Sequence, residues 1–265
     1  MSEPVYSRMT GAVVPEMGWV PPFRYLLRRS RILSLLRTVP RGALLEIGCG
    51  AGALLCDLGR MGFVVQGLET SAEARAQAER VAKCTLSDHE IHSVPQASWD
   101  SGFDFVCAFD VLEHIEDDRG ALELWLRWLK PEGSLLLSVP AHRSRWGAGD
   151  EWAGHWRRYD RHDIQRLVRS CGLEIFHLEC YGFPLANLTE WAGNRIYRKL
   201  IRQRGEISKN QASAASGVDR RSYVSLSRVI TSVPGKILVS MAFALQNATE
   251  NVDWGSGYLL LAKRS

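Results

Sequence analysis

Residues 150–161, DEWAGHWRRYDR, form the most chemically varied stretch of the chain. Its aromatic and basic side chains are Trp152, His155, Trp156, Arg157, Arg158, Tyr159 and Arg161. Imidazole and phenol groups can move protons. Arginines bind carboxylates or phosphates through paired hydrogen bonds, and indole rings stack on flat faces. Four interpretations are therefore open: nucleic-acid binding, anion binding, an active-site wall, or a helix cap.

The glycine-rich segment LLEIGCGAG is a second candidate site, with Gly48, Gly50 and Gly52 between an expected strand and an expected helix. Glycine permits a sharp turn and close approach of the backbone to a ligand, and the helix N-terminus favours a negative group. Glu69 follows about twenty residues later, where an acid can accept both hydroxyls of a ribose. The spacing predicts an adenosine-containing cofactor. It departs from G-x-G-x-x-G, which disfavours a dinucleotide and hence a dehydrogenase.

Alternating apolar strands and amphipathic helices between residues 42 and 181 predict a doubly wound, mostly parallel α/β sheet. We expect an irregular lead-in over 1–22, then a helix over 23–39, a weak third strand over 83–88, and a helix capped by Ser71. A helical excursion follows, and the apolar segment 257–264 returns to the sheet. The expected organisation is one domain, 1–265, with a helical cap over 1–40, a cofactor-binding core over 42–181, a helical insertion or lid over 182–256, and a last strand over 257–264.

Composition limits the class of protein. The net charge is only +4, so we expect no nucleic-acid partner. The six cysteines form no C-x-x-C pair, which indicates reduced thiols rather than a zinc site. The N-terminus has no signal-peptide pattern. The apolar stretch 233–245 is shorter than the roughly 18–20 residues that span a bilayer. We therefore expect a soluble cytoplasmic protein, whose stretch 233–245 could contact a membrane surface or close over an apolar ligand.

Three segments together resemble the class I S-adenosylmethionine-dependent methyltransferases of the type 11/12 group: LLEIGCGAG, FDFVCAFDVLEHIEDD and LKPEGSLLLSVP. The resemblance covers residues 42–180 and the last strand, and it implies a seven-stranded Rossmann-like sheet with S-adenosyl-L-methionine as cofactor. Glu132 stands where the family usually has glycine. The acid near adenine is Asp88 or Glu90. The implied cofactor-binding residues are Glu46, Gly48, Cys49, Gly50, Gly52, Glu69, Asp88 and Asp110.

In such a fold the segments after the fourth and fifth strands border the transferred methyl group. The candidate general bases there are His114, His155 and Tyr159. The candidate acceptor-binding residues are Arg143, Trp146, Trp156, Arg157 and Arg158. The alternatives are a solvated acidic turn around Glu113 and His114, and a loop whose tryptophans only pack while its arginines stay solvated. Asp110, Glu113 and His114 could also bind a hard metal ion, although we expect no metal.

The leading hypothesis is methyl transfer to a small-molecule acceptor, with a hydroxyl group favoured as the methylated group. The acceptor could be a sugar, a lipid-linked molecule or a secondary metabolite that carries an acidic group. N- or C-methylation, a nucleic-acid or protein acceptor, and a non-catalytic cofactor-binding protein remain alternatives. The insertion is rich in lysine and arginine. It could close over an anionic substrate or contact anionic lipid head groups. The sequence predicts no particular oligomeric state.

Overall fold

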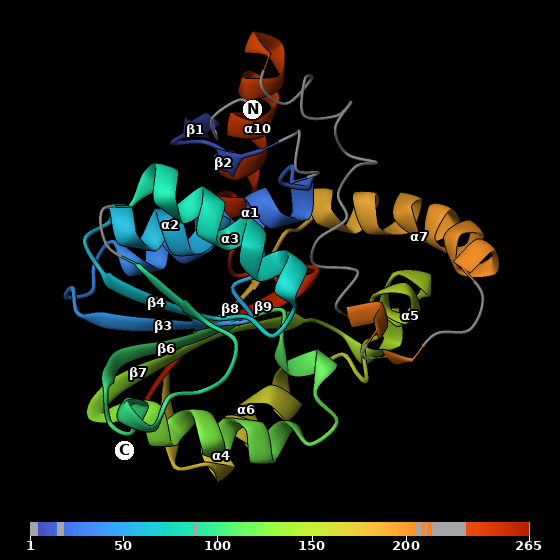
Figure 1. Ribbon diagram of the computed structural model, residues 1–265. Helices are drawn as coiled ribbons and strands as arrows, with labels where there is room; N and C mark the ends of the chain where they lie inside the picture. The colour runs from blue at the N-terminus through green and yellow to red at the C-terminus, as the bar shows by residue number, and fades with distance from the viewer. Residues whose placement is uncertain are drawn as a thin grey trace.

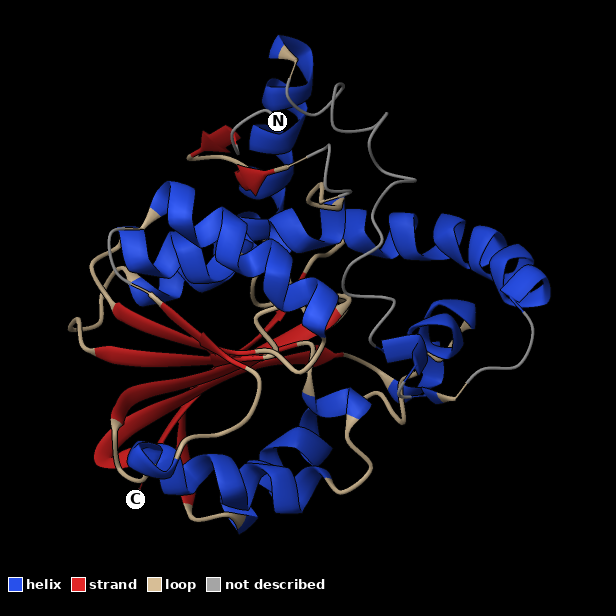
Figure 2. Cartoon of the chain, in the orientation of Figure 1, coloured by secondary structure: helices blue, strands red, loops and turns tan. Residues whose placement is uncertain are grey.

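A computed structural model describes residues 5–14, 19–86, 89–204, 208–209, 211–213 and 232–264. Its centre is a seven-stranded sheet in the order β5-β4-β3-β6-β7-β9-β8, with helices on both faces (Figures 1 and 2). Strands β3 to β7 are parallel, and β9 runs antiparallel to both of its neighbours. The strands are β3 (Ala43–Ile47), β4 (Val64–Leu68), β5 (Glu90–His92), β6 (Phe103–Phe109), β7 (Leu129–Pro140), β8 (Leu173–Tyr181) and β9 (Gly257–Arg264).

Helices lie above the sheet and below it in the view of Figure 1. The upper helices are α1 (Phe23–Leu36), α2 (Ala53–Arg60) and α3 (Ala72–Thr85). The lower helices are α4 (Asp118–Trp128) and α6 (Arg161–Ser170). Beyond the sheet lie α5 (Ala148–Ala153), α7 (Leu185–Arg204) and α10 (Val233–Ala248). No described helix is long and apolar enough to span a bilayer.

Strand β6 shows why the sheet is buried on both faces. Val106 packs into the core beneath α4 and α6, whereas Phe105 and Cys107 pack into the core beneath α1 and α2. A central parallel strand covered by helices on both sides needs apolar residues at every position. The sequence FDFVCAF supplies them everywhere except at the partly exposed Asp104, and the predicted fold class is confirmed.

The structure departs from the predicted elements in three places. The lead-in is not wholly irregular, because β1 (Val5–Ser7) and β2 (Gly11–Val13) form a short antiparallel hairpin. The third strand predicted over 83–88 is wrong: α3 continues to Thr85, since Val81 and Ala82 pack against α2, and the third strand is β5. Helix α5 falls in a predicted loop. Within the insertion predicted to be helical, α10 begins at Val233, and residues 214–231 lie outside the described residues.

The features predicted to do chemistry meet at one edge of the sheet, where the parallel strands end. The glycine loop follows β3, Glu69 follows β4, Asp110 follows β6, and residues 141–160 follow β7. Ligands of open α/β sheets bind at this carboxyl edge, near the point where the strand order reverses. In this sheet the reversal lies between β3 and β6.

Candidate active site

Two glycines in the loop after β3 have different surroundings. Gly48 has φ +66°, and a Cβ there would lie 2.6 Å from Cγ2 of Val111, so glycine lets the loop after β6 pack against it. Gly50 has φ +54°, and no atom lies within 4 Å of where its Cβ would be. Residue 48 therefore serves packing, whereas residue 50 leaves open space for a ligand.

Glu69 lies beside this loop and binds its backbone. Its Oε2 accepts a hydrogen bond from the Gly50 amide at 2.9 Å, and its Oε1 accepts one from the Ser71 amide at 2.8 Å. Two carboxylate oxygens offer about four acceptor positions, so hydroxyl groups can still bind. Ser71 itself caps α3, as predicted, by accepting from the Ala74 amide. Cys49 is buried, and burial raises the pKa of its thiol well above the ordinary value.

Glu46 and Arg28 are buried close together beneath α1. Burial raises the pKa of Glu46 to about 8, although the positive charge of Arg28 opposes this shift. Neither Oε2 of Glu46 nor Nε of Arg28 has a hydrogen-bond partner among the described residues. A buried polar atom without a partner is costly, so such atoms indicate a missing ligand. A ligand with an ammonium and a carboxylate group would satisfy both side chains.

Asp110 is held by two arginines from α1. Its Oδ2 lies 2.5 Å from Nη1 of Arg28 and 3.1 Å from Nη1 of Arg24. Burial raises the pKa of Asp110, but Arg24 and Arg28 lower it more, so the net pKa falls below the ordinary value. Ser138 donates to Oδ1 at 3.1 Å. Asp110 has φ +55° and is an ion-pair centre rather than a helix N-cap.

Beyond Asp110 lies a cluster of two histidines and a buried acid. The rings of His114 and His155 meet edge to face, with 4.7 Å between their centroids. Glu113 is fully buried, its Oε1 lies 3.9 Å from Nε2 of His155, and neither of its oxygens has a hydrogen-bond partner among the described residues. Burial raises the pKa of Glu113 well above its ordinary value, and burial with the nearby His155 lowers the pKa of His114 to about 4.

A charge network from the loop after β7 orients His155. Nδ1 of His155 lies 2.9 Å from Oδ1 of Asp150, and Nε of Arg158 lies 2.8 Å from the same oxygen. Arg158 also pairs with Glu190 of α7, which in turn pairs with Arg145 at 2.9 Å. Burial raises the pKa of Asp150, but its bonds to His155 and Arg158 outweigh this and lower the pKa to about 2. We name residues Asp150, His155, Arg158 and Glu190 the relay network.

Two groups of side chains in the described part of the chain could hold a metal ion. The ligand atoms of Glu113, His114 and His155 lie within 4.8 Å of one another, and so do those of His142, Cys180 and Asp253. Imidazole with carboxylate suits divalent transition metals. Asp110, which the sequence groups with Glu113 and His114, is instead engaged by Arg24 and Arg28. The expected absence of a metal stays a prediction.

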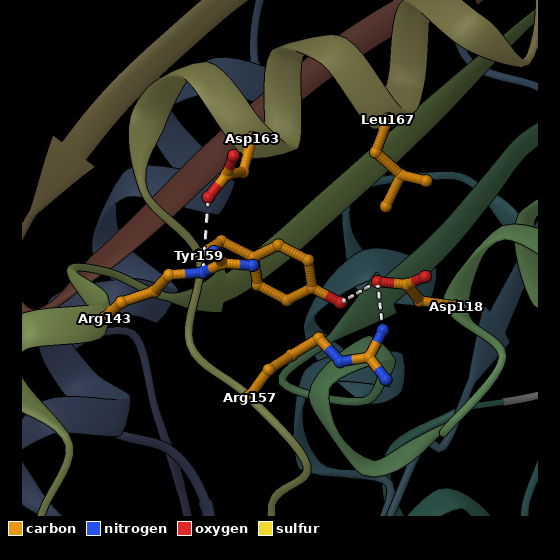
Figure 3. A pocket seen from close by; sticks show the side chains of 6 residues that line it. All are labelled: Asp118, Arg143, Arg157, Tyr159, Asp163 and Leu167. Carbon is orange, nitrogen blue, oxygen red and sulfur yellow. Dashed lines mark hydrogen bonds and ion pairs between the residues drawn. The ribbon is translucent and has the colours of Figure 1, made fainter.

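The structure separates Tyr159 from the two histidines. Its hydroxyl donates to Asp118 at 2.9 Å, and burial followed by this acid raises the pKa of the phenol far above its ordinary value (Figure 3). Tyr159 lines a hollow of about 320 Å³ together with Asp118, Arg143, Arg157, Asp163 and Leu167. Arg157 pairs with Asp118 at 2.6 Å, and Arg143 pairs with Asp163 at 3.2 Å. Both arginines therefore already have carboxylate partners.

The remaining predicted residues are more exposed or fall outside the described chain. Trp146 is 40% exposed. The ring of Trp156 lies 3.7 Å beneath the ammonium of Lys209, and its amide donates to the Glu113 carbonyl at 2.7 Å. Asp88 lies outside the described residues, whereas Glu90 is exposed at the start of β5. A substrate role for these residues stays a prediction.

Sequence reasoning missed Arg24, Arg28, Asp150 and Glu190 as parts of the site. The arginines among the leucines of α1 look like the solvated side of an amphipathic helix, yet Arg28 is turned toward the sheet. Asp150 and His155 are five residues apart, and a helical turn with Gly154 at φ +76° brings them together. Only a spacing search for acid–histidine pairs would have found Asp150, and no local signal identifies Glu190.

The strand order, the open glycine loop and the Glu69 carboxylate together define an α/β domain that binds an adenosine-containing cofactor. Arg28 and Glu46 fit the amino-acid end of S-adenosylmethionine, and Glu69 fits the hydroxyls of its ribose. These are the residues that would hold it. Unpartnered atoms of Glu46 and Arg28 support the first contact, and the position of Glu69 beside the open space at Gly50 supports the second.

A family model described as a methyltransferase domain matches residues 23–178, and the chain belongs to this family of class I S-adenosylmethionine-dependent methyltransferases. A ubiquinone biosynthesis O-methyltransferase of Paramagnetospirillum magneticum is 30% identical over 145 residues, which cover 51% of this chain and 57% of the relative. The chain thus spans little more than half the length of this curated relative.

Solved structures with low sequence identity share the fold. An S-adenosylmethionine-dependent methyltransferase from Mesorhizobium loti is 15% identical with a TM-score of 0.54, covering 92% of this chain and 98% of that one. Magnesium protoporphyrin IX methyltransferase from Synechocystis, solved with bound S-adenosylhomocysteine, is 15% identical with a TM-score of 0.51, covering 90% and 82%. These structures therefore confirm the predicted fold, and the family model confirms the predicted family with its cofactor.

Proposed function

We propose that the protein methylates a hydroxyl group of a small-molecule acceptor and that His155 accepts the hydroxyl proton. The observation that carries this proposal is the contact between Nδ1 of His155 and the buried Asp150 carboxylate at 2.9 Å. A proton on Nδ1 leaves Nε2 as the acceptor, because the partner of one ring nitrogen sets the state of the other. Similarity to O-methyltransferases supports a hydroxyl rather than an amine or a carbon as the acceptor atom.

When bound, S-adenosylmethionine supplies an electrophilic methyl group, which passes to the acceptor oxygen while the electron pair of the broken C–S bond stays on sulfur. The side chains of Glu46, Arg28 and Glu69 hold and orient the cofactor. The relay network fixes the tautomer and the ring plane of His155. A positioned base of this kind typically accelerates a reaction by about 10² to 10⁴.

The class of acceptor rests on the arginines near the site. A sugar, a lipid-linked molecule or a secondary metabolite with an acidic group remains the predicted class. Arg158 does not favour direct binding of an anion, since Asp150 and Glu190 already neutralise it. Arg143 and Arg157 line the hollow of Figure 3 and are the more exposed candidates for such a contact.

The test compares labelled methyl transfer from S-adenosylmethionine to a metabolite extract by the natural protein, His155→Ala and Asp150→Asn. Mass spectrometry of the product identifies the methylated atom. We expect His155→Ala to lower turnover at least a hundredfold while the affinity for S-adenosylhomocysteine changes less than about threefold, since the base acts only in the transition state.

His162→Ala is the matched control, because the side chain of this histidine is 67% exposed on the outer side of α6. It should leave turnover unchanged. Equal losses of cofactor affinity and turnover in His155→Ala would reduce His155 to a structural role. A labelled product that carries its methyl group on nitrogen or carbon would reject the hydroxyl acceptor. A cofactor-bound protein that labels nothing in any extract would favour the non-catalytic alternative.

A further inference from the structure

Large hydrophobic side chains are exposed mainly on two helices. Of the fifteen that are exposed among the described residues, nine lie on α7 and α10. We call these nine side chains, with the cations between them, the outer helical face. The nine are Leu188, Trp191, Ile196, Leu200, Val233, Ile237, Leu238, Met241 and Leu245. Single exposed hydrophobic residues are ordinary, but a concentration of this kind marks an interaction surface.

Among the described residues, helix α10 contacts the body of the protein along one side. Val239 and Ala242 are buried in clusters with residues of α1, and the Gln246 amide donates to the Leu27 carbonyl at 3.1 Å. Away from these contacts Val233 is 73% exposed, and Leu238 and Met241 are each 63% exposed. The helix contains no acidic residue, and its one charged residue, Lys236, is exposed. Exposed apolar side chains of this kind do not contribute to the hydrophobic core and so do not stabilise the fold.

Helix α7 combines apolar and basic side chains on its outer face. Its inner face contacts α5, where the Gly149 amide donates to Asn194 at 2.9 Å and the rings of Tyr197 and Trp152 lie 5.0 Å apart. The outer face, at spacings of three or four residues, presents Leu188, Trp191, Arg195, Arg198, Lys199 and Arg202. Arg195 stacks over the Trp191 ring at 4.2 Å. The one acid of α7, Glu190, is engaged by Arg145 and Arg158.

We propose that the outer helical face binds the surface of an anionic lipid bilayer. Helices that lie in a membrane interface have an apolar face, cations beside it and aromatic residues at the boundary. Both α7 and α10 pack against α1 (Figure 1). The charge on this face is wholly positive, which matches anionic head groups and opposes self-association of two like copies. This inference is independent of the proposed reaction.

The test is co-sedimentation of the full chain with phosphatidylcholine vesicles and with mixed phosphatidylcholine–phosphatidylglycerol vesicles. We expect binding to the anionic vesicles alone, and weaker binding as salt is raised. Replacing Arg195, Arg198 and Arg202 by glutamine should lower the partition constant about a hundredfold, since each cation near an anionic surface contributes about fivefold. Replacing Ile237, Leu238 and Met241 by serine should lower it at least about tenfold.

The matched control replaces Arg119, Arg127 and Arg169 by glutamine, which removes the same charge from α4 and α6 on the other face of the sheet. This variant should bind like the natural protein, and thermal melting should show that all variants fold. If the control and the α7 variant lose vesicle binding equally, binding depends on the overall charge of the protein, and the proposal is overturned. It is also overturned by failure to bind anionic vesicles, or by a dimer in sedimentation velocity that the serine variant converts to a monomer.

Discussion

The two halves of the active-site edge are built in opposite ways. The cofactor half, below α1 and beside β3 and β4, uses main-chain amides, an open glycine and the carboxylate of Glu69, with the unpartnered atoms of Glu46 and Arg28 nearby. The acceptor half, after β6 and β7, uses side-chain charges that compensate one another through Asp150, His155 and Arg158. The first leaves free space for a ligand, and the second is a closed network of charges that Glu190 of α7 completes.

Because of this difference, substitutions in the two halves should affect different properties of the protein. A main-chain cradle tolerates loss of a side chain with little effect on folding, so its variants should lose ligand affinity. A buried charge network leaves an uncompensated charge when one member is removed, so its variants should lose stability. The four predictions that follow, in order of decreasing effect, test that division.

Arg158→Ala should lower the free energy of unfolding by about 3–5 kcal/mol, because Asp150 would remain buried without the Arg158 cation and Glu190 would keep only Arg145. Urea unfolding followed by circular dichroism measures the change. Arg143→Ala removes a more exposed ion pair and is the matched control, with an expected loss within about 1 kcal/mol. Equal losses in the two variants would mean that the relay network is no more structural than the surface.

The contribution of Glu46 to stability should fall as pH rises from about 5 to 8. Its pKa is raised from 4.5 to about 8 on folding, so the folded state binds more protons than the unfolded chain between these values. That contribution is complete below pH 4.5 and is lost as pH rises through 8, at up to roughly 1.4 kcal/mol per pH unit.

Comparison of thermal melts of the natural protein with Glu46→Gln isolates this slope, because the other titrating groups are common to both. The glutamine variant should lose stability less steeply over that pH range. Parallel pH profiles for the two proteins would show that Glu46 is ionised in the folded state.

Glu69→Ala should lower the affinity for S-adenosylhomocysteine about 10- to 100-fold, since a hydrogen bond to a charged group contributes about 1.5–3 kcal/mol. Isothermal titration calorimetry measures the dissociation constant. The relay network lies elsewhere, so the unfolding midpoint should change far less than in Arg158→Ala. Glu90→Ala, at the exposed start of β5, tests in the same assay whether a second acid contacts the adenosine. An unchanged affinity in Glu69→Ala would remove this residue from the cofactor half.

Gly50→Ala and Gly48→Ala form the mildest test. Alanine at either position pays roughly 1–2 kcal/mol for the left-handed backbone. Gly48→Ala additionally places a methyl group 2.6 Å from Val111, whereas the space at Gly50 is open. Calorimetry and urea unfolding should therefore show a larger stability loss for Gly48→Ala. Gly50→Ala should mainly lose cofactor affinity, and the reverse ranking would contradict the assignment of the open space to a ligand.

Much of the fold was predictable because its signals are local. The apolar strands, the Ser71 cap and the glycine loop each depend on a few neighbouring residues, and all lie where the sequence indicates. The third strand was misplaced because Val81 and Ala82 extend α3 by packing against α2, a tertiary contact that local pattern does not show. The hairpin of β1 and β2 was missed for a similar reason: its strands are only three residues long.

The residues of the candidate site were also predictable only in part. His114 and His155 were named from their residue type and position after the parallel strands, and they do meet. Tyr159 was named on the same grounds, yet its hydroxyl contacts Asp118 on the side of the sheet covered by α4 and α6. Two residues in one loop can point to different sides of a sheet, and only the path of the chain decides which.

The sequence by itself determined the α/β architecture, the methyltransferase family and the cofactor, because these depend on short motifs whose backbone geometry glycine and strand alternation impose. The tertiary structure alone decided that Arg28 turns inward toward Glu46 and Asp110, and that Asp150 and Glu190 secure Arg158 and His155. Such charge pairs join residues from five to more than eighty positions apart. Their partners are selected by burial, where an unpaired charge is too costly to persist.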